Sequence, residues 1–147
     1  MEMAELNQLL EENRSNLENF LQVLSEQQKY LIDNNIRGLE ESIGKEEKLL
    51  NLIEDVKQKT SGVISELIEK FSVEVNGTKL SEFINVVKDK IKIDQTVLLQ
   101  KKIVELANQV KEMNKQNKVL IEHARSFIKA TVNALANENC LVLDRKV

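Results

Sequence analysis

Residues 93–135 read IDQTVLLQKKIVELANQVKEMNKQNKVLIEHARSFIKATVNAL, and this stretch decides the fold class. One line of a heptad repeat passes through Leu99, Leu106, Met113, Leu120, Phe127 and Ala134. A second line of the same heptad passes through Ile103, Val110, Asn117, Ala124 and Thr131. An uninterrupted repeat of this length predicts a long amphipathic helix, from about Ile93 to Leu135, that packs along a coiled-coil-like seam.

Two further stripes of apolar residues with helical spacing precede this helix. The first covers roughly residues 3–33 and includes Leu6, Leu10, Leu17, Phe20, Leu24 and Leu31. The polar cluster Asp33-Asn34-Asn35 is the best candidate for its end. The second stripe runs from Ile36 to Phe71, and Gly62 within it marks either a bend or a close approach of two helices.

The pattern changes after Phe71, where residues 72–79 contain the turn dipeptide Asn76-Gly77 and form the main predicted loop. A short helix follows, with Leu80, Phe83, Ile84, Val87 and Ile91 on one side. Long segments joined by short polar connections favour an all-α, antiparallel bundle of three long helices plus one short helix. The alternative is a homodimeric coiled coil, in which the same seams pair between chains.

We expect residues 1–135 to form a single helical-bundle domain. Residues 136–147 lose the periodicity, and we expect them to form a mobile C-terminal tail.

The composition excludes several classes of partner. The chain of 147 residues has no proline, no tryptophan and a net charge of −3, with acidic and basic residues interleaved. Without a basic stripe, nucleic acid is not an expected partner. No apolar run reaches the ~18 residues that a membrane span needs, so membrane insertion is not expected. The N-terminus is acidic and helical in pattern rather than a signal peptide. These features predict a cytoplasmic protein.

The residues that carry most enzyme chemistry do not gather into a motif. His123 is the single histidine, and Cys140 is the single cysteine, which cannot form an internal disulfide. The glycines are scattered, so no phosphate-binding loop is formed. No metal-binding pattern of His and Cys is present either. We therefore expect neither an enzyme nor a bound cofactor or metal.

The second half of the long helix points to binding instead. Its apolar residues spread beyond the two heptad lines, at Val119, Leu120, Ile121, Ala124, Phe127, Ile128, Thr131, Val132 and Leu135. The helix is also about ten residues longer than the others, so roughly 15 Å of it is expected to overhang the bundle. An exposed apolar overhang promotes aggregation unless it is covered. Either a partner covers it, or the loop, the short helix or the tail folds over it.

Asn117 stands on the heptad seam and has two interpretations. An amide at a seam position weakens packing but fixes the register of the helices. Alternatively, the amide bonds to the backbone of a bound peptide.

Three segments resemble the flagellar export chaperones of the FlgN family. They are Gln27-Gln28-Lys29-Tyr30-Leu31 at the end of the first helix, the segment LEESIGKEEKLL at residues 39–50, and LANQVKEMNKQNKVLIEHARSF at residues 106–127. The last is the most specific, because its Asn114-x-x-Asn117-x-x-Leu120-Ile121 spacing is similar to a segment of the family. The resemblance covers most of the chain.

The resemblance implies a chaperone of the cytoplasm that binds the C-terminal helical ends of hook-filament junction proteins, which are hook-associated proteins. It implies that the chaperone keeps these subunits unassembled and delivers them to the flagellar export apparatus. Such a protein is expected to be a monomer or a weak homodimer. The family's cargo site lies near the C-terminus, so the candidate cargo-binding residues here are Asn117, Leu120, Ile121, Ala124, Phe127, Ile128, Val132 and Leu135.

The tail departs from the family. Members often carry a C-terminal aromatic residue that is implicated in docking at the export gate, whereas no aromatic residue follows Phe127 here. Leu141-Val142-Leu143 is a candidate substitute.

Overall fold

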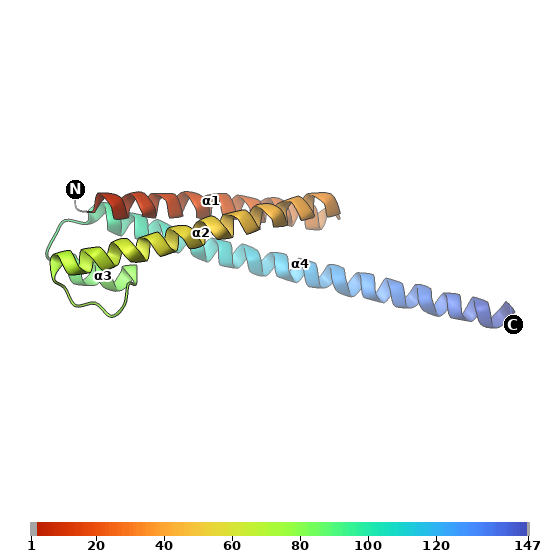
Figure 1. The fold of residues 1–147 in the computed structure, drawn as a ribbon. Helices are drawn as coiled ribbons and strands as arrows, with labels where there is room; N and C mark the ends of the chain where they lie inside the picture. Colours follow the sequence, from red (N-terminus) through yellow and green to blue (C-terminus); the bar gives the residue numbers. More distant parts are fainter. Residues whose placement is uncertain (1–2, 147) are drawn as a thin grey trace.

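The computed structural model describes the backbone of residues 3–146 and the side chains of residues 3–137. Within this part the chain forms four helices: α1 (Ala4–Ile32), α2 (Ile36–Phe71), α3 (Leu80–Val87) and α4 (Asp94–Lys146). Helices α1 and α2 form a hairpin, α4 runs along it, and α3 lies at the end where α4 begins (Figure 1). The predicted all-α bundle of three long helices and one short helix is confirmed.

The break between α1 and α2 depends on two asparagines. Asn34 adopts the left-handed conformation with φ 55°, which an L-residue other than Gly or Asn rarely takes. The next amide, of Asn35, donates to the Tyr30 carbonyl at 2.9 Å, which closes the end of α1 in a Schellman arrangement. The Asn35 side chain then accepts a hydrogen bond from the Gly38 amide and caps the start of α2. The predicted break therefore lies at residues 33–35.

Helices α1 and α4 run parallel to each other, and α2 runs antiparallel to both (Figure 1). The side-chain hydrogen bonds between α1 and α4 confirm the parallel direction, because the number of residues between the two partners is nearly the same at both ends of the contact. Thr96 bonds to Asn7 near one end, and Asn117 bonds to the Leu24 carbonyl near the other, with separations of 89 and 93 residues. Helix α2 returns the chain to the end where α1 begins, and the loop and α3 stay at that end, so α4 starts there and runs parallel to α1.

The main apolar core lies at the end that holds α3. Phe83 of α3 is fully buried and packs in a cluster with residues from the first half of α1, the second half of α2 and the start of α4. The most deeply buried members of the cluster are Leu6, Leu10, Ile64, Phe83 and Val87. Toward the other end of the bundle, Gln27, Ser42 and Asn117 are buried as well. The core is thus apolar at the α3 end and more polar at the end from which α4 projects.

Helix α4 continues to Lys146, beyond the end that we predicted at Leu135. The prediction used the loss of apolar periodicity, but periodicity reports packing against a neighbour rather than helix formation itself. Residues 136–146 contain no glycine or proline, and six of the eleven are good helix formers: Ala136, Glu138, Leu141, Leu143, Arg145 and Lys146. The backbone therefore stays helical where the bundle no longer covers it.

Candidate functional site

The part of α4 beyond the bundle is the most exposed apolar surface of the described chain. Every side chain from Arg125 to Asn137 is exposed. Phe127 is 73% exposed, Ile128 60%, Val132 56% and Leu135 54%. Residues 125–146 extend the helix by about 33 Å at a rise of 1.5 Å per residue, which is twice the overhang that we expected. We call residues 125–146 the α4 overhang.

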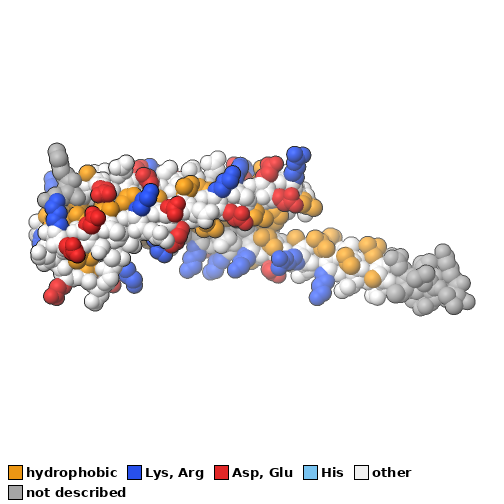
Figure 2. All heavy atoms as spheres, in the orientation of Figure 1, with side chains coloured by type: hydrophobic (Ala, Val, Ile, Leu, Met, Phe, Trp, Pro, Cys, Tyr) orange, Lys and Arg blue, Asp and Glu red, His pale blue; other side chains and the backbone are white. Residues whose placement is uncertain are grey.

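The apolar side chains of the overhang continue the face of α4 that packs inside the bundle. At about 100° per residue, Leu120, Ile121, Ala124, Phe127, Ile128, Val132 and Leu135 fall within an arc of about 140°. The centre of that arc has the same direction as Asn117, which faces α1. Figure 2 shows hydrophobic side chains along one side of the overhang as it leaves the bundle. The overhang therefore presents a bundle seam without a neighbouring helix.

The α1–α2 turn adds apolar surface where the overhang begins. Ile32 and Ile36 on either side of the turn are 64% and 72% exposed. A shallow hollow of about 430 Å³ lies between the end of α1 and α4, lined by Gln28, Ile32, Gln116, Val119, Leu120 and His123. Gln28 and Gln116 are joined across it by a hydrogen bond of 3.1 Å. The exposed apolar surface thus runs from the hairpin end onto α4.

Asn117 lies beneath this surface rather than on it. It is 1% exposed, and its amide nitrogen donates to the Leu24 carbonyl at 2.9 Å and to Gln27 Oε1 at 3.1 Å. Its Oδ1 atom is buried and has no hydrogen-bond partner among the described residues. This geometry corresponds to the register role, one of the two interpretations that the sequence left open.

Glu46 of α2 extends the same polar layer. Burial raises the pKa of its carboxyl above the ordinary value of 4.5, and a hydrogen bond from Gln27 offsets part of that rise. Gln27 therefore bonds to both of its neighbours, Asn117 on α4 and Glu46 on α2. A continuous polar layer crosses all three long helices just before the overhang begins.

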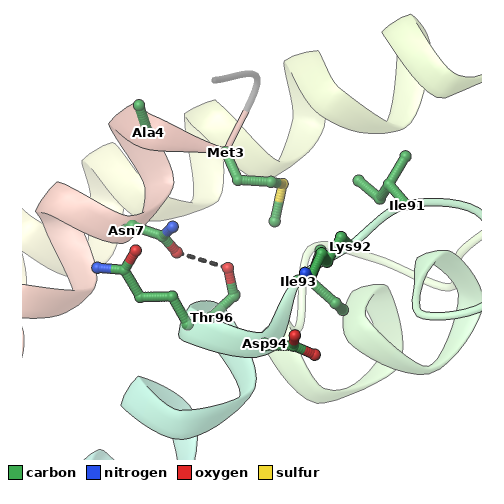
Figure 3. Close-up of a pocket in the computed structure, with 9 residues that line it drawn as sticks. Met3, Ala4, Asn7, Ile91, Lys92, Ile93, Asp94 and Thr96 are labelled. Atoms are coloured by element: carbon green, nitrogen blue, oxygen red, sulfur yellow. Dashed lines mark hydrogen bonds between the residues drawn. The ribbon is translucent and has the colours of Figure 1, made fainter.

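A second hollow, of about 760 Å³, lies at the opposite end of the bundle (Figure 3). Met3 and Asn7 of the chain's start face Ile93 and Thr96 at the start of α4, and the Thr96 hydroxyl donates to Asn7 Oδ1. Thr96 is fully buried. This hydrogen bond and the apolar side chains around it hold the first turns of α1 and α4 together. The residues that line this hollow therefore serve helix packing.

The remaining chemistry of the described residues is sparse. No group of three or more His, Cys, Asp or Glu residues among them could hold a metal ion. Across the described range, no helix is long and apolar enough to cross a membrane. His123 is exposed on α4. The side chains of Cys140 and of Leu141-Val142-Leu143 lie outside the described residues.

A comparison with protein-family models matches residues 1–139 of the chain to the FlgN protein family. The chain belongs to the FlgN family. No curated protein and no solved structure matches it with significance. FlgN proteins act as chaperones in flagellar biogenesis and type III export, so the export-chaperone class that the sequence predicted is confirmed at the level of the family.

The structure brings most of the predicted cargo-binding residues onto one surface of this FlgN protein. Leu120, Ile121 and Ala124 are half-buried at the junction with the bundle, and Phe127, Ile128, Val132 and Leu135 are exposed on the overhang. Ile32 of the hairpin end borders the same surface and was absent from our prediction. Its position beside the polar break indicated exposure alone, because an isoleucine next to Asp33-Asn34-Asn35 has little of the bundle left to pack against.

Proposed function

We propose that this FlgN-family protein is a cytoplasmic export chaperone that binds the C-terminal helical segments of hook-filament junction proteins. In this role it keeps the subunits unassembled until they reach the flagellar export apparatus. The contact surface consists of the exposed and half-buried residues Leu120, Ile121, Ala124, Phe127, Ile128, Val132 and Leu135. Asn117 is left out of this surface because it is buried in the bundle.

The observation that carries the proposal is an apolar helix face with no neighbouring helix. Inside the bundle, α1 covers the corresponding face of α4. On the overhang the same face is open, and it includes Phe127 at 73% exposure. Exposed apolar surface of this extent is typical of protein-binding sites. An amphipathic cargo helix laid along this face would take the place that α1 occupies in the bundle.

Such binding explains how a chaperone can prevent early assembly. A C-terminal helix that must pack against other subunits in the assembled structure needs its apolar stripe free. Covering that stripe with α4 buries the assembly surface of the cargo and the overhang of the chaperone together. A large aromatic side chain such as Phe127 is the kind of residue that dominates interface energies when it becomes buried.

Single substitutions on the overhang test this proposal. Phe127→Asp and Ile128→Asp place a carboxylate on the apolar face, and each is expected to abolish calorimetric binding of the junction proteins' C-terminal segments. Both positions are solvent-exposed, so the helical circular dichroism of the free protein should be unchanged. The matched control is Val104→Asp, at a 51% exposed apolar position on the bundle part of the same helix. Wild-type affinity in both overhang variants, or equal loss in the control, would place the cargo elsewhere.

Self-association is the alternative function that the open face also fits. The seams of α1 and α2 are satisfied within one chain, so a second copy would pair through the overhang. Sedimentation of the free protein over a dilution series distinguishes the chaperone from the self-associating coiled-coil protein. A chaperone that is open for cargo sediments as a monomer, or as a weak dimer at the highest concentrations alone, whereas a structural coiled-coil protein sediments as a dimer that dissociates on dilution.

A further inference from the structure

Among the overhang residues whose side chains the structure describes, 125–137, the charges are few and lie on one side. Between Ala124 and Asn137 the charged residues are Arg125 and Lys129, in a chain whose net charge is −3. At about 100° per residue, these two side chains and Lys118 fall in one arc that adjoins the Val132 edge of the apolar face. The opposite edge is formed by His123, Ala130 and Ala134. Figure 2 shows lysine and arginine side chains along one side of α4, next to the hydrophobic side chains.

These cations are weakly engaged within the protein. Arg125 lies 3.7 Å from Glu122, but the two side chains are 75% and 67% exposed, so the pair contributes little. Lys118 and Lys129 are exposed, and no carboxylate within 4 Å of either is found among the described side chains. Their charges are therefore available to a partner that lies on the neighbouring apolar face.

We infer that the overhang selects a cargo helix whose apolar stripe is flanked on one edge by acidic side chains, which face Lys118, Arg125 and Lys129. The inference rests on the proposed function and adds the charge pattern of its partner. Arg125 and Lys129 are one helical turn apart, so carboxylates spaced three or four residues apart on a cargo helix would meet both. A cargo with lysines on that edge would bring like charges together and bind more weakly.

The electrostatic part of the interaction should show in salt dependence. Exposed charges are screened beyond about 10 Å at 0.1 M salt, and more strongly as salt rises. Charge complementarity at the rim of an interface acts mainly on the association rate and on partner choice. Binding of the natural cargo should therefore weaken with salt, while the apolar contact is retained.

The decisive variant reverses the two charges of residues 125–137, as Arg125→Glu with Lys129→Glu. Its matched control is Lys57→Glu with Lys59→Glu, which makes the same charge change at exposed positions of α2. The probes are fluorescently labelled C-terminal segments of the organism's hook-filament junction proteins, measured by anisotropy between roughly 0.05 M and 0.5 M salt. We expect the overhang reversal to weaken binding about tenfold at low salt and to abolish the salt dependence, while the control binds like the wild type.

A second arm changes the cargo. Replacing the acidic residues on one edge of its stripe by lysine should restore binding to the reversed protein and weaken binding to the wild type. Wild-type affinity of the reversed protein at every salt concentration would overturn the inference. So would a bound segment that has no acidic residue along either edge of its stripe.

The outcomes separate this inference from the function on which it rests. If Ile128→Asp abolishes binding while the charge reversal has no effect, the apolar site stands and the acidic flank is wrong. If the wild type binds none of the segments, or Phe127→Asp and Ile128→Asp both bind as well as the wild type, both the proposed function and this inference are overturned.

Discussion

The side-chain amide of Asn117 donates a hydrogen bond of 2.9 Å to the main-chain carbonyl of Leu24, which ties α4 to α1 shortly before the overhang begins. The same nitrogen also donates to Gln27 Oε1 at 3.1 Å. An apolar helix pair can slide by one turn at little cost, whereas a buried amide has its partners in one register alone. The polar layer therefore determines where along α4 the bundle ends and the open face starts.

Replacing Asn117 with alanine removes both bonds and leaves the Gln27 amide oxygen without its donor. We expect the free energy of unfolding to fall by about 1–3 kcal/mol, the usual cost of orphaning a buried polar group. Urea titration followed by circular dichroism measures this change. The control is Asn114→Ala, at an exposed position one turn earlier, where the change should stay within about 0.5 kcal/mol. Equal stability of the two variants would contradict a structural role for Asn117.

The raised pKa of Glu46 leads to a prediction of how the free energy of unfolding depends on pH. Because burial raises the pKa of Glu46 in the folded protein, the fold favours the protonated carboxyl. Its contribution is fully present below the ordinary value of 4.5 and is lost as pH rises through the higher folded pKa. Glu46→Gln, which keeps a hydrogen-bonding side chain without the charge, should therefore raise stability at pH 7 and flatten its decline above pH 4.5.

Urea midpoints collected from pH 4 to pH 7 for wild type and Glu46→Gln check this expectation. The neighbouring Glu47→Gln makes the same charge change at an exposed position and serves as the control. A larger stabilisation at pH 7 in the control than in Glu46→Gln would show that general charge repulsion, rather than burial, is responsible.

The heptad lines of α4 and the stripes of α1 and α2 were sufficient to predict the helical bundle, because apolar periodicity follows from which faces are buried. The break at Asp33-Asn34-Asn35 was predictable for a similar reason, since asparagine tolerates the left-handed conformation that Asn34 adopts. The end of α4 was not predictable in this way. Beyond the bundle there is no neighbour to impose a period, and the sequence there has no glycine or proline that would end the helix before Lys146.

The sequence indicated which part of α4 forms the candidate site, but it did not identify every residue of the site correctly. The apolar spread after Val119 indicated the surface, but the heptad alone cannot tell a buried seam amide from an exposed one, so Asn117 entered the candidate list. Ile32 could not be assigned to this surface without knowing that α1 and α4 run parallel, which brings its end next to Val119 and Leu120. The parallel direction follows from α2, which returns the chain to the end where α1 begins, so that α4 starts there.

Gly38 and Gly62 both lie in α2, but their surroundings differ in a way that the sequence does not show. Replacing each by alanine is therefore expected to have opposite effects on stability. A Cβ atom on Gly38 would lie 2.5 Å from Cδ1 of the Tyr30 ring, so Gly38→Ala should destabilise the α1–α2 turn by about 1–3 kcal/mol. Gly62 is exposed and has nothing within 4 Å of that position, so it marks no close helix approach. Gly62→Ala should stabilise α2 by about 1 kcal/mol through helix propensity. Thermal unfolding of both variants measures the two changes, and a stabilised Gly38→Ala would show that the Tyr30 ring moves away freely.

Ending the chain after Ala124 separates the bundle from the surface that we propose to bind cargo. Because every described side chain from Arg125 to Asn137 is exposed, the truncation removes no described part of the core. The free energy of unfolding should therefore change by no more than about 0.5 kcal/mol, whereas binding of the junction proteins' C-terminal segments should be lost. Urea titration and calorimetry on the same preparation measure both. A truncated protein that still binds would place the cargo on the bundle, and one that unfolds would show that the overhang stabilises the fold from which it projects.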